Sequence, residues 1–461
     1  MSKWINKWII GALIVAALLV AHLIEENHDA TVPMGEVIGL DEDKFMAAAV
    51  ASSLNMMNNT REVIMNDSSE GKDPSEKKKP SKDNEISKED KKIYRRDVHI
   101  KSHGCLRATF SVPDDLERKY RWGVFEKPDN YDAWIRYSNG DYTYKRDRSP
   151  DARGMAIKLM GVEGEQLLPS QKGARTQDFV MMNSKNYFIR ELKDYIELTQ
   201  YLAKNSNFGY FLNGPSWNPF TWRLRELKLV GGTKKNFFWP LKSIINTQFW
   251  SASAYRLGPE QNIKFSAKAV DCKTGKKAEN PTFKTKSSHY NYLRGRLKER
   301  LKPGQKLGPA CFDFMVQMQV PGKNMPVEDA TIVWDEDDAP FKKVARIKIP
   351  LQDFDTPEQN NFCENLSFNP WHGVHDHKPI GVFNRVRKAL YTEVARYRYA
   401  ENKVLYRSND EADANESSVP PILQVGEPPE PEDWCIDEAR LNCGSELLRE
   451  SEPSKETDQP T

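Results

Sequence analysis

The chain has 461 residues, and its 68 lysines and arginines nearly balance its 66 aspartates and glutamates, for a net charge of +2. This balance gives no global positive field of the kind that attracts nucleic acid, so we expect no nucleic-acid partner. The length suffices for one large domain with appendages or for two to three average domains.

Residues 1–26 have the charge pattern of an anchor or export segment. Two lysines precede an uncharged apolar run from Trp8 to Ile24, and two glutamates follow it. Positive charge before the run and negative charge after it favour an N-terminus inside and the rest of the chain on the exported side. No small-x-small cleavage site follows the run. We therefore predict an uncleaved N-terminal membrane anchor, with a cleaved signal peptide and secretion as the alternative.

The composition changes at both ends of a central unit. Residues 27–92 combine a predicted helix over 41–65 with the charged, turn-forming stretch 71–92, which cannot form a core and is predicted to be a linker. Residues 408–461 are rich in Glu, Asp, Pro and Ser and are predicted to be an acidic, mainly disordered tail. The globular domain is therefore expected over 93–407.

Apolar and polar residues alternate with a period of two throughout this domain, which predicts strands. In the clearest case, alternate residues from Phe312 to Val320 lie on one face. Other strands are predicted at 133–140, 154–162, 177–182, 249–257, 262–270 and 344–351, and helices at 186–205 and 381–402. Such widely spread strands predict an α+β fold around one large antiparallel sheet or closed barrel.

The six cysteines occur singly, which argues against a zinc knuckle or a thioredoxin-type site. We expect most of them to be buried free thiols. In an exported protein, the two in the tail are also candidates for a local disulfide. The cysteines are Cys105, Cys272, Cys311, Cys363, Cys435 and Cys443.

The stretch DVHIKSHGC (97–105) places His99 and His103 four residues apart, the spacing of two metal ligands on one helix face. Val98 and Ile100 instead flank His99 in a strand-like pattern, and Gly104 weakens any helix. We therefore expect no two-histidine zinc site, and we expect His103 to be a hydrogen-bonded structural residue.

A second stretch, NRVRKALYTEVARYR (384–398), contains a tyrosine with basic neighbours. In a helix, Arg387 and Tyr391 lie one turn apart on one face, and Arg398 lies two turns beyond Tyr391. An arginine beside a tyrosine oxygen favours the phenolate over the phenol, whose ordinary pKa is about 10. A phenolate is a hard, strongly donating ligand for ferric iron, and tyrosine-ligated haem is the catalase arrangement.

Five segments in the same order show that the chain resembles the haem catalase superfamily, most closely its shorter branch of catalase-related peroxidases. The segments are RDVHIK (R-x-x-H-x-K), WIRYSNG (R-F-S), PDARGMAIKL (D-x-R-G-x-A-x-K), DFVMMNSKNYFIRE (the distal asparagine strand and the helix after it) and RKALY (R-x-x-x-Y). The resemblance covers roughly residues 93–405.

The resemblance implies a role for each matched residue. His99 is implied as the distal catalytic histidine, with Ser138 as its hydrogen-bond partner and Asn183 as a further distal group. Tyr391 is implied as the axial ligand of the iron, with Arg387 as its partner. The other implied cofactor contacts are Arg96, Arg136 and Arg398 to the propionates, Tyr195 stacked on the haem, and Val98.

The asparagine segment departs from the family pattern. Ungapped, the family's asparagine position falls on Met182, and Asn183 comes one residue late. A shift of one residue in a strand turns a side chain to the opposite face, but a β-bulge restores it. We predict Asn183 in the pocket through such a bulge.

The resemblance implies an α+β fold: a large antiparallel β-barrel of the haem catalase type with surrounding helices, preceded by the N-terminal membrane anchor. It implies haem b (iron protoporphyrin IX) as cofactor and decomposition of hydrogen peroxide or an organic hydroperoxide as function, on the exported (periplasmic or extracytoplasmic) side.

Two alternative functions remain. One is allene oxide synthase-like conversion of fatty-acid hydroperoxides, which a wide apolar channel near 205–245 would favour. The other is a non-enzymatic haem-binding protein tethered to a membrane. The stretch WHGVHDH (371–377) holds three of the eight histidines, and we expect it to be a surface loop rather than a metal site.

Overall fold

The computed structural model describes residues 35–39, 41–66, 96–203, 210–211, 223, 226, 240–279, 281–283, 290–402, 405–406 and 423–424. The predicted membrane anchor, the charged linker, most of 205–245 and the two cysteines of the tail lie outside these residues. No helix in the described part of the chain is long and apolar enough to cross a membrane.

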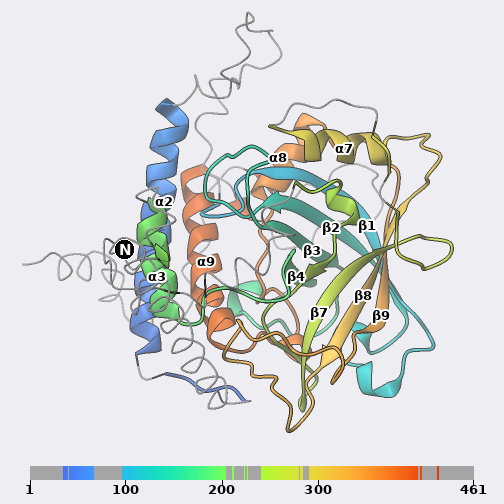
Figure 1. The fold of residues 1–461 in the computed structure, drawn as a ribbon, viewed down its shortest axis with the longest axis horizontal. Helices are drawn as coiled ribbons and strands as arrows, with labels where there is room; N and C mark the ends of the chain where they lie inside the picture. The colour runs from blue at the N-terminus through green and yellow to red at the C-terminus, as the bar shows by residue number, and fades with distance from the viewer. Residues whose placement is uncertain are drawn as a thin grey trace, which may run out of the picture.

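An antiparallel β-barrel forms the centre of the domain (Figure 1). Hydrogen-bonded neighbours follow the order β5-β4-β3-β2-β1-β9-β8-β7, and β5 pairs with β7 as well as with β4, so the ring closes. The predicted antiparallel barrel is thereby confirmed. Its strands are β1 (Ser102–Val112), β2 (Asp129–Asn139), β3 (Arg153–Met160), β4 (Thr176–Met182), β5 (Phe249–Trp250), β6 (Tyr255–Leu257), β7 (Gln261–Val270), β8 (Ala310–Met318) and β9 (Lys342–Ile349).

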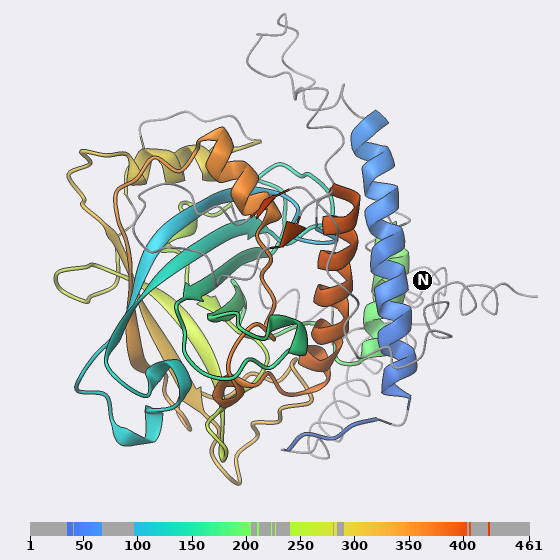
Figure 2. The same cartoon turned by 180° about the vertical axis from the view of Figure 1, so that it is seen from behind.

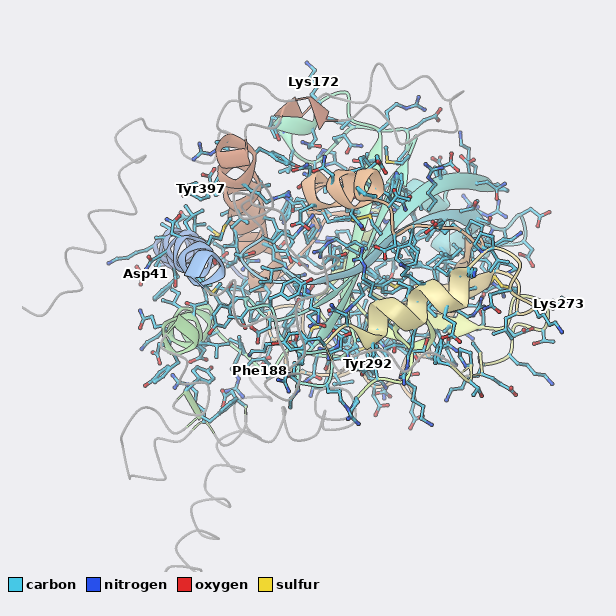
Figure 3. All side chains as sticks on the ribbon, turned by 90° about the horizontal axis from the view of Figure 1, so that it is seen from above. Asp41, Lys172, Phe188, Lys273, Tyr292 and Tyr397 are labelled. Atoms are coloured by element: carbon cyan, nitrogen blue, oxygen red, sulfur yellow. A yellow bond between two sulfur atoms is a disulfide. The ribbon has the colours of Figure 1, made fainter. Side chains whose placement is uncertain are left out.

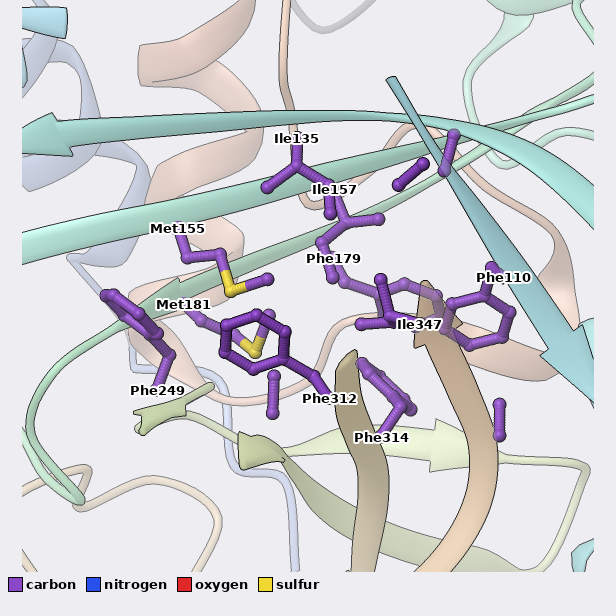
Figure 4. Close-up of a cluster of buried hydrophobic side chains, with 14 of the residues drawn as sticks. Phe110, Ile135, Met155, Ile157, Phe179, Met181, Phe249, Phe312, Phe314 and Ile347 are labelled. Atoms are coloured by element: carbon purple, nitrogen blue, oxygen red, sulfur yellow. The ribbon is translucent and has the colours of Figure 1, made fainter. Parts of the chain in front are cut away.

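The alternating apolar residues fill the barrel interior (Figure 4). The rings of Phe179 and Phe314 lie 4.7 Å apart between centroids, and Phe110 lies 5.2 Å from Phe314. Each such buried side chain contributes roughly 1.5–3 kcal/mol. Because side chains of all the long strands pack into this one core, a cofactor-sized site is to be sought outside the barrel.

The predicted strand 249–257 is divided in the structure into β5 and β6. Ala252 between them has a φ of 58°, in the left-handed region that a residue with a Cβ rarely adopts. The chain therefore bends there, and only Phe249–Trp250 bridges β4 and β7.

Three helices lie together on one side of the barrel (Figures 1 and 2): α2 (Glu42–Asn66), α3 (Leu192–Ala203) and α9 (Val382–Asn402). Val50 and Met57 of α2 pack against Leu390 and Val394 of α9. Tyr397 of α9, labelled in Figure 3, donates a hydrogen bond to Asn58 of α2 at 2.7 Å. The three predicted helices are thus confirmed, with α3 shorter than the predicted 186–205.

Two shorter helices cover another part of the barrel, α7 (Tyr292–Leu301) and α8 (Pro357–Asn365). Neither was predicted, and neither was β1. A small pairing of β10 (Leu405–Tyr406) with β11 (Leu423–Gln424) follows α9.

The prediction of free thiols is wrong for four of the cysteines. Cys105 of β1 forms a disulfide with Cys363 of α8, and Cys272 forms one with Cys311 of β8. The bonded partners are 258 and 39 residues apart in sequence. Cysteine spacing alone does not reveal such pairs, because the fold brings them together.

Candidate active site

A cavity that is partly open to solvent lies between the barrel and α9. Seven of the ten predicted site residues line it. The full lining is Arg96, Asp97, Val98, His99, Arg136, Ser138, Gly154, Met155, Ala156, Val180, Met181, Ser367, Phe368, Tyr391, Val394, Ala395 and Arg398.

His99 enters this cavity from the segment before β1. Its Nδ1 lies 3.0 Å from Ser138 Oγ on β2, so Nε2 is the nitrogen left for other partners. Burial, followed by the positive charges of Arg136 and Arg387, lowers the pKa of His99 to about 3. The imidazole is therefore neutral near pH 7 and able to accept a proton. Its backbone φ of 60° is a strained value of the kind that clusters at functional sites.

Gly154 of β3 leaves room for the pair of His99 and Ser138. A Cβ at this position would lie 2.7 Å from His99 Nδ1 and 2.8 Å from Ser138 Oγ. Any side chain at position 154 would therefore displace the pair, which explains why the strand has glycine there.

His103 lies outside the cavity lining, as predicted for a structural residue. It is fully buried, and its Nε2 lies 2.7 Å from Asn139 Oδ1. Burial and the charge of Arg153 lower its pKa well below the ordinary value. The two histidines of DVHIKSHGC thus differ in environment. His99 lines a cavity, whereas His103 is packed in the interior and hydrogen-bonded to Asn139.

Three arginines give the cavity an excess of positive charge. Arg96, Arg136 and Arg398 all line it, against a single carboxyl group, that of Asp97. Burial and then the charges of Arg136 and Arg398 lower the pKa of Arg96 well below its usual value. Arg398 is 2% exposed, and its Nε is buried without a hydrogen bond in the described structure. This arrangement is suited to an anionic ligand.

Tyr391 lines the cavity from α9, and Arg387, one turn earlier, lies 5.8 Å from the centre of its ring. Burial raises the pKa of Tyr391 to about 12, although Arg387 opposes this shift. Arg387 is also shared: it donates to Tyr187 Oη and, at 3.3 Å, to Asn384 Oδ1. Arg387 therefore lies near the ring of Tyr391, while these hydrogen bonds go to Tyr187 and Asn384. The arginine does not by itself ionise the phenol.

Three predicted residues do not line the cavity: Asn183, Tyr195 and Arg387. Asn183 follows β4 and extends its pairing with β3, since its Oδ1 accepts from the Arg153 N–H at 2.7 Å. No bulge turns it into the cavity; the β3–β4 register runs without a shift to Met182. Tyr195 packs among α2, α3 and α9.

Other lining residues were not predicted. Asp97 is adjacent to the predicted Arg96 and Val98, and burial raises the pKa of its carboxyl to about 6. Ser367 and Phe368 come from the segment after α8, which no motif marks. Met155 and Met181 face each other across β3 and β4, and the period-two alternation predicted only the strands that carry them.

The prediction of a surface loop for WHGVHDH is wrong for two of its three histidines, and only His375 is exposed. His372 and His377 are buried, at 6% and 2% exposed. His372 Nδ1 lies 3.2 Å from Asp178 Oδ2, and His377 Nε2 accepts from the Val124 N–H at 3.0 Å. Within the described part of the chain, no three metal-ligating side chains of His, Cys, Asp or Glu converge.

The residues of the cavity fit a haem. A haem carries two carboxylates, and the cavity holds three arginines, among them Arg398 with its buried Nε without a hydrogen bond. Its flat ring requires apolar walls, which Val98, Ala156, Val180, Phe368 and Val394 provide, and its iron accepts a tyrosine oxygen as ligand. Tyr391 is the lining residue of that type.

The chain belongs to the catalase family, since the family model described as Catalase matches residues 83–413, more than half of the chain. Family membership makes it an oxidoreductase acting on peroxide, and haem is the usual cofactor of the family. A comparison with curated proteins finds no match.

Solved structures of catalases share the fold. A fungal catalase matches with a TM-score of 0.50 at 16% identity, over 80% of this chain and 74% of that one. Catalase A from Saccharomyces cerevisiae matches with a TM-score of 0.50 at 16% identity, over 80% and 75%. A bacterial catalase matches with a TM-score of 0.51 at 14% identity, over 79% and 72%.

Proposed function

We propose that this chain decomposes peroxide on a haem b, which Tyr391 would bind through its oxygen as a ligand of the iron, with His99 as the proton-transfer group. The observation that carries the proposal is that one cavity is lined by the His99–Ser138 pair, by Tyr391 and by three arginines. When bound, the haem supplies the iron that exchanges electrons with the peroxide.

His99 manages the proton of the substrate. In the tautomer in which Nδ1–H donates to Ser138 Oγ, the neutral imidazole would use Nε2 to accept the proton from one peroxide oxygen and return it to the other, which leaves as water when the O–O bond breaks. Asn183 does not line the cavity. We therefore assign the proton transfer to His99 alone, without help from the side-chain amide of Asn183.

The arginines and Tyr391 would hold the cofactor. Arg96, Arg136 and Arg398 would bind its propionates in charge-assisted pairs. Tyr391 would provide an oxygen ligand, with the positive charge of Arg387 near its ring. Binding of a metal lowers the pKa of its ligand, which offsets the effect of burial on this phenol.

We also propose that the domain functions on the exported side of a membrane, held there by the N-terminal segment. The two disulfides support export, because disulfides are rare in reducing compartments. Fractionation of cells that produce the full chain tests this. Full-length, uncleaved protein in the soluble cytosolic fraction would contradict it.

The test of the proposed function is an absorption spectrum with a peroxide consumption trace. The purified chain should bind one haem and show the ferric spectrum of a tyrosine-ligated iron. It should consume hydrogen peroxide, with evolution of oxygen if catalase chemistry dominates. A folded chain that cannot be loaded with haemin would refute the proposal.

The same assay distinguishes the alternatives. A haem-loaded chain that converts fatty-acid hydroperoxide but not hydrogen peroxide would favour the allene oxide synthase-like function. A haem-loaded chain inert to both would favour a binding protein.

A further inference from the structure

We infer that the disulfide between Cys105 and Cys363 positions Arg96 and Arg398 to bind the carboxylates of the cofactor. The inference rests on the proposed function, because it concerns how that site holds a haem. It makes the two cysteines positioning residues, acting through the arginines that line the cavity.

The disulfide joins the barrel wall to the helix beside the cavity. Cys105 lies on β1 directly opposite Arg136 of β2 in the strand register, and Arg136 lines the cavity. Cys363 lies in the last turn of α8. Both cysteines are buried, at 2% and 3% exposed. The bond thus fixes the C-terminal end of α8 relative to the strand pair that carries a cavity arginine.

The end of α8 holds the other two arginines through its backbone. Arg96 donates from Nη2 to the carbonyl oxygens of Cys363 at 3.3 Å and Leu366 at 2.5 Å, and from Nη1 to the Glu364 carboxylate at 3.3 Å. Arg398 donates from Nη1 to the carbonyl oxygen of Glu364. Carbonyls in the last turn of a helix lack intrahelical partners and are therefore free to accept such bonds.

The two guanidinium groups repel each other, so their placement depends on these acceptors. The charge of Arg398 contributes to the lowered pKa of Arg96; Arg398 is buried, and the side chain of Arg96 is 12% exposed. The carbonyl oxygens at the end of α8, which accept hydrogen bonds from both arginines, therefore offset this repulsion. A binding site needs support that holds its side chains within roughly 0.5 Å of the positions that contact the ligand.

Contacts besides the disulfide also hold α8 against the barrel. Gln359 donates to the carbonyl oxygen of Cys105 at 2.7 Å, and the rings of Phe362 and Trp134 lie 4.7 Å apart. We therefore expect loss of the disulfide to loosen the end of α8 and its carbonyls, without detaching the helix.

The second disulfide is a matched control. Cys272 follows β7 and Cys311 lies on β8, and neither lines the cavity. Three forms of the full chain are compared: wild type, Cys105→Ala/Cys363→Ala and Cys272→Ala/Cys311→Ala. Alanine is chosen because a serine would place an unpaired hydroxyl group in these buried positions.

The first readout needs no haem. Mass spectrometry follows the rate at which phenylglyoxal modifies Arg96 and Arg398 in the cofactor-free chains. We expect faster modification of both arginines in Cys105→Ala/Cys363→Ala, and an unchanged rate in the control variant. Equal rates in wild type and Cys105→Ala/Cys363→Ala would overturn the inference, as would equal acceleration in both variants.

The second readout is the rate at which loaded chains lose haem to excess apomyoglobin. Loss should be faster by about tenfold in Cys105→Ala/Cys363→Ala, by analogy with removal of groups that orient ligands. In a background of Arg96→Gln/Arg398→Gln the same cysteine changes should have no further effect, because neither of the two arginines held by the end of α8 remains. Additive effects would contradict the inference. Failure of wild type to bind haem would refute the proposed function, while the arginine modification rates would still decide this inference.

Discussion

At the scale of single residues, the two histidines of the opening motif make a matched pair for mutation. His99→Gln should reduce peroxide turnover by about a hundred- to ten-thousandfold while haem stays bound, because the proton-transfer group is lost and the iron ligand is not touched. His103→Gln should retain most of the turnover, because its side chain bonds only within the packed protein at Asn139. Initial rates of peroxide consumption per bound haem measure both. The reverse order would show that the working histidine is misassigned.

Tyr391 provides the second residue-scale prediction. Tyr391→Phe removes the oxygen and keeps the ring, so we expect the tyrosinate–iron absorption features to disappear and haem affinity to fall by at least about tenfold. Arg387→Ala should weaken the same features less, since it removes charge but not the ligand. Tyr397→Phe is the control, as its hydroxyl contacts Asn58 and not the cavity. Loss of the spectrum in Tyr397→Phe alone would mean that the register of α9 is misassigned.

Much of the candidate site was predictable from sequence, because charged and aromatic side chains at fixed spacing mark it. His99, Arg136 and Tyr391 do line one cavity. The position of Asn183 was not predictable, since it depends on whether β4 contains a bulge, and the regular register shows that it does not. Asp97 and the segment after α8 line the cavity because of tertiary packing, and such packing leaves no local pattern in the sequence.

At the scale of elements, α2 is attached to the rest of the domain by a partly buried ionic cluster. Arg385 at the start of α9 pairs with Glu36 at 2.8 Å, Glu42 at 2.5 Å and Glu328 at 3.0 Å. Its side chain is 13% exposed. This cluster joins the N-terminal helix to the helix that carries Tyr391.

Arg385→Ala should therefore destabilise the attachment of α2. Loss of a partly buried charge partner costs on the order of 1–3 kcal/mol, so amide hydrogen exchange should accelerate in α2 and remain unchanged in α8. Lys127→Ala, which removes an exposed pair with Glu163, is the control and should leave both stability and hydrogen exchange essentially unchanged. Exchange that rises equally in both helices would contradict the local role of the cluster.

Period-two alternation located the long strands well because their inner faces share one apolar core. It failed at β5 and β6, where the positive φ of Ala252 bends the chain. It also missed β1, whose outer face carries Cys105 against the buried cluster under α8. The polar helix α8 has little helical periodicity of its own and is fixed by its Thr356 cap, which accepts from the Gln359 N–H.

At the scale of the whole molecule, buried neutral histidines set the stability of the fold in acid. Burial lowers the pKa of His377 to about 4 from its ordinary 6.5, and lowers those of His99, His103 and His372 as well. Between the two pKa values of such a group the unfolded chain binds more protons than the folded one. For His377, the contribution of the neutral buried imidazole to the free energy of unfolding is therefore complete above pH 6.5 and is lost as the pH falls towards 4.

The variant His377→Gln isolates one of these groups, because glutamine can still accept from the Val124 N–H and does not titrate. The free energy of unfolding of wild type relative to this variant should decrease by roughly 3 kcal/mol between pH 6.5 and pH 4 and then level off. Denaturant titrations at a series of pH values measure the difference. The raised pKa values of Asp97 and Asp151 act in both proteins and cancel. A difference independent of pH would show that His377 is not held neutral.

The ring of strands has a consequence for how the chain is made. β1 pairs on one side with its successor β2 and on the other with β9, where Phe110 lies opposite Ile347. During synthesis the early strands can form hairpins, but the last seam must wait until more than two hundred further residues have left the ribosome. Contacts so distant in sequence make folding slow. Until the seam closes, one apolar edge stays exposed to self-association, so newly made protein should depend on assistance that the finished barrel no longer needs.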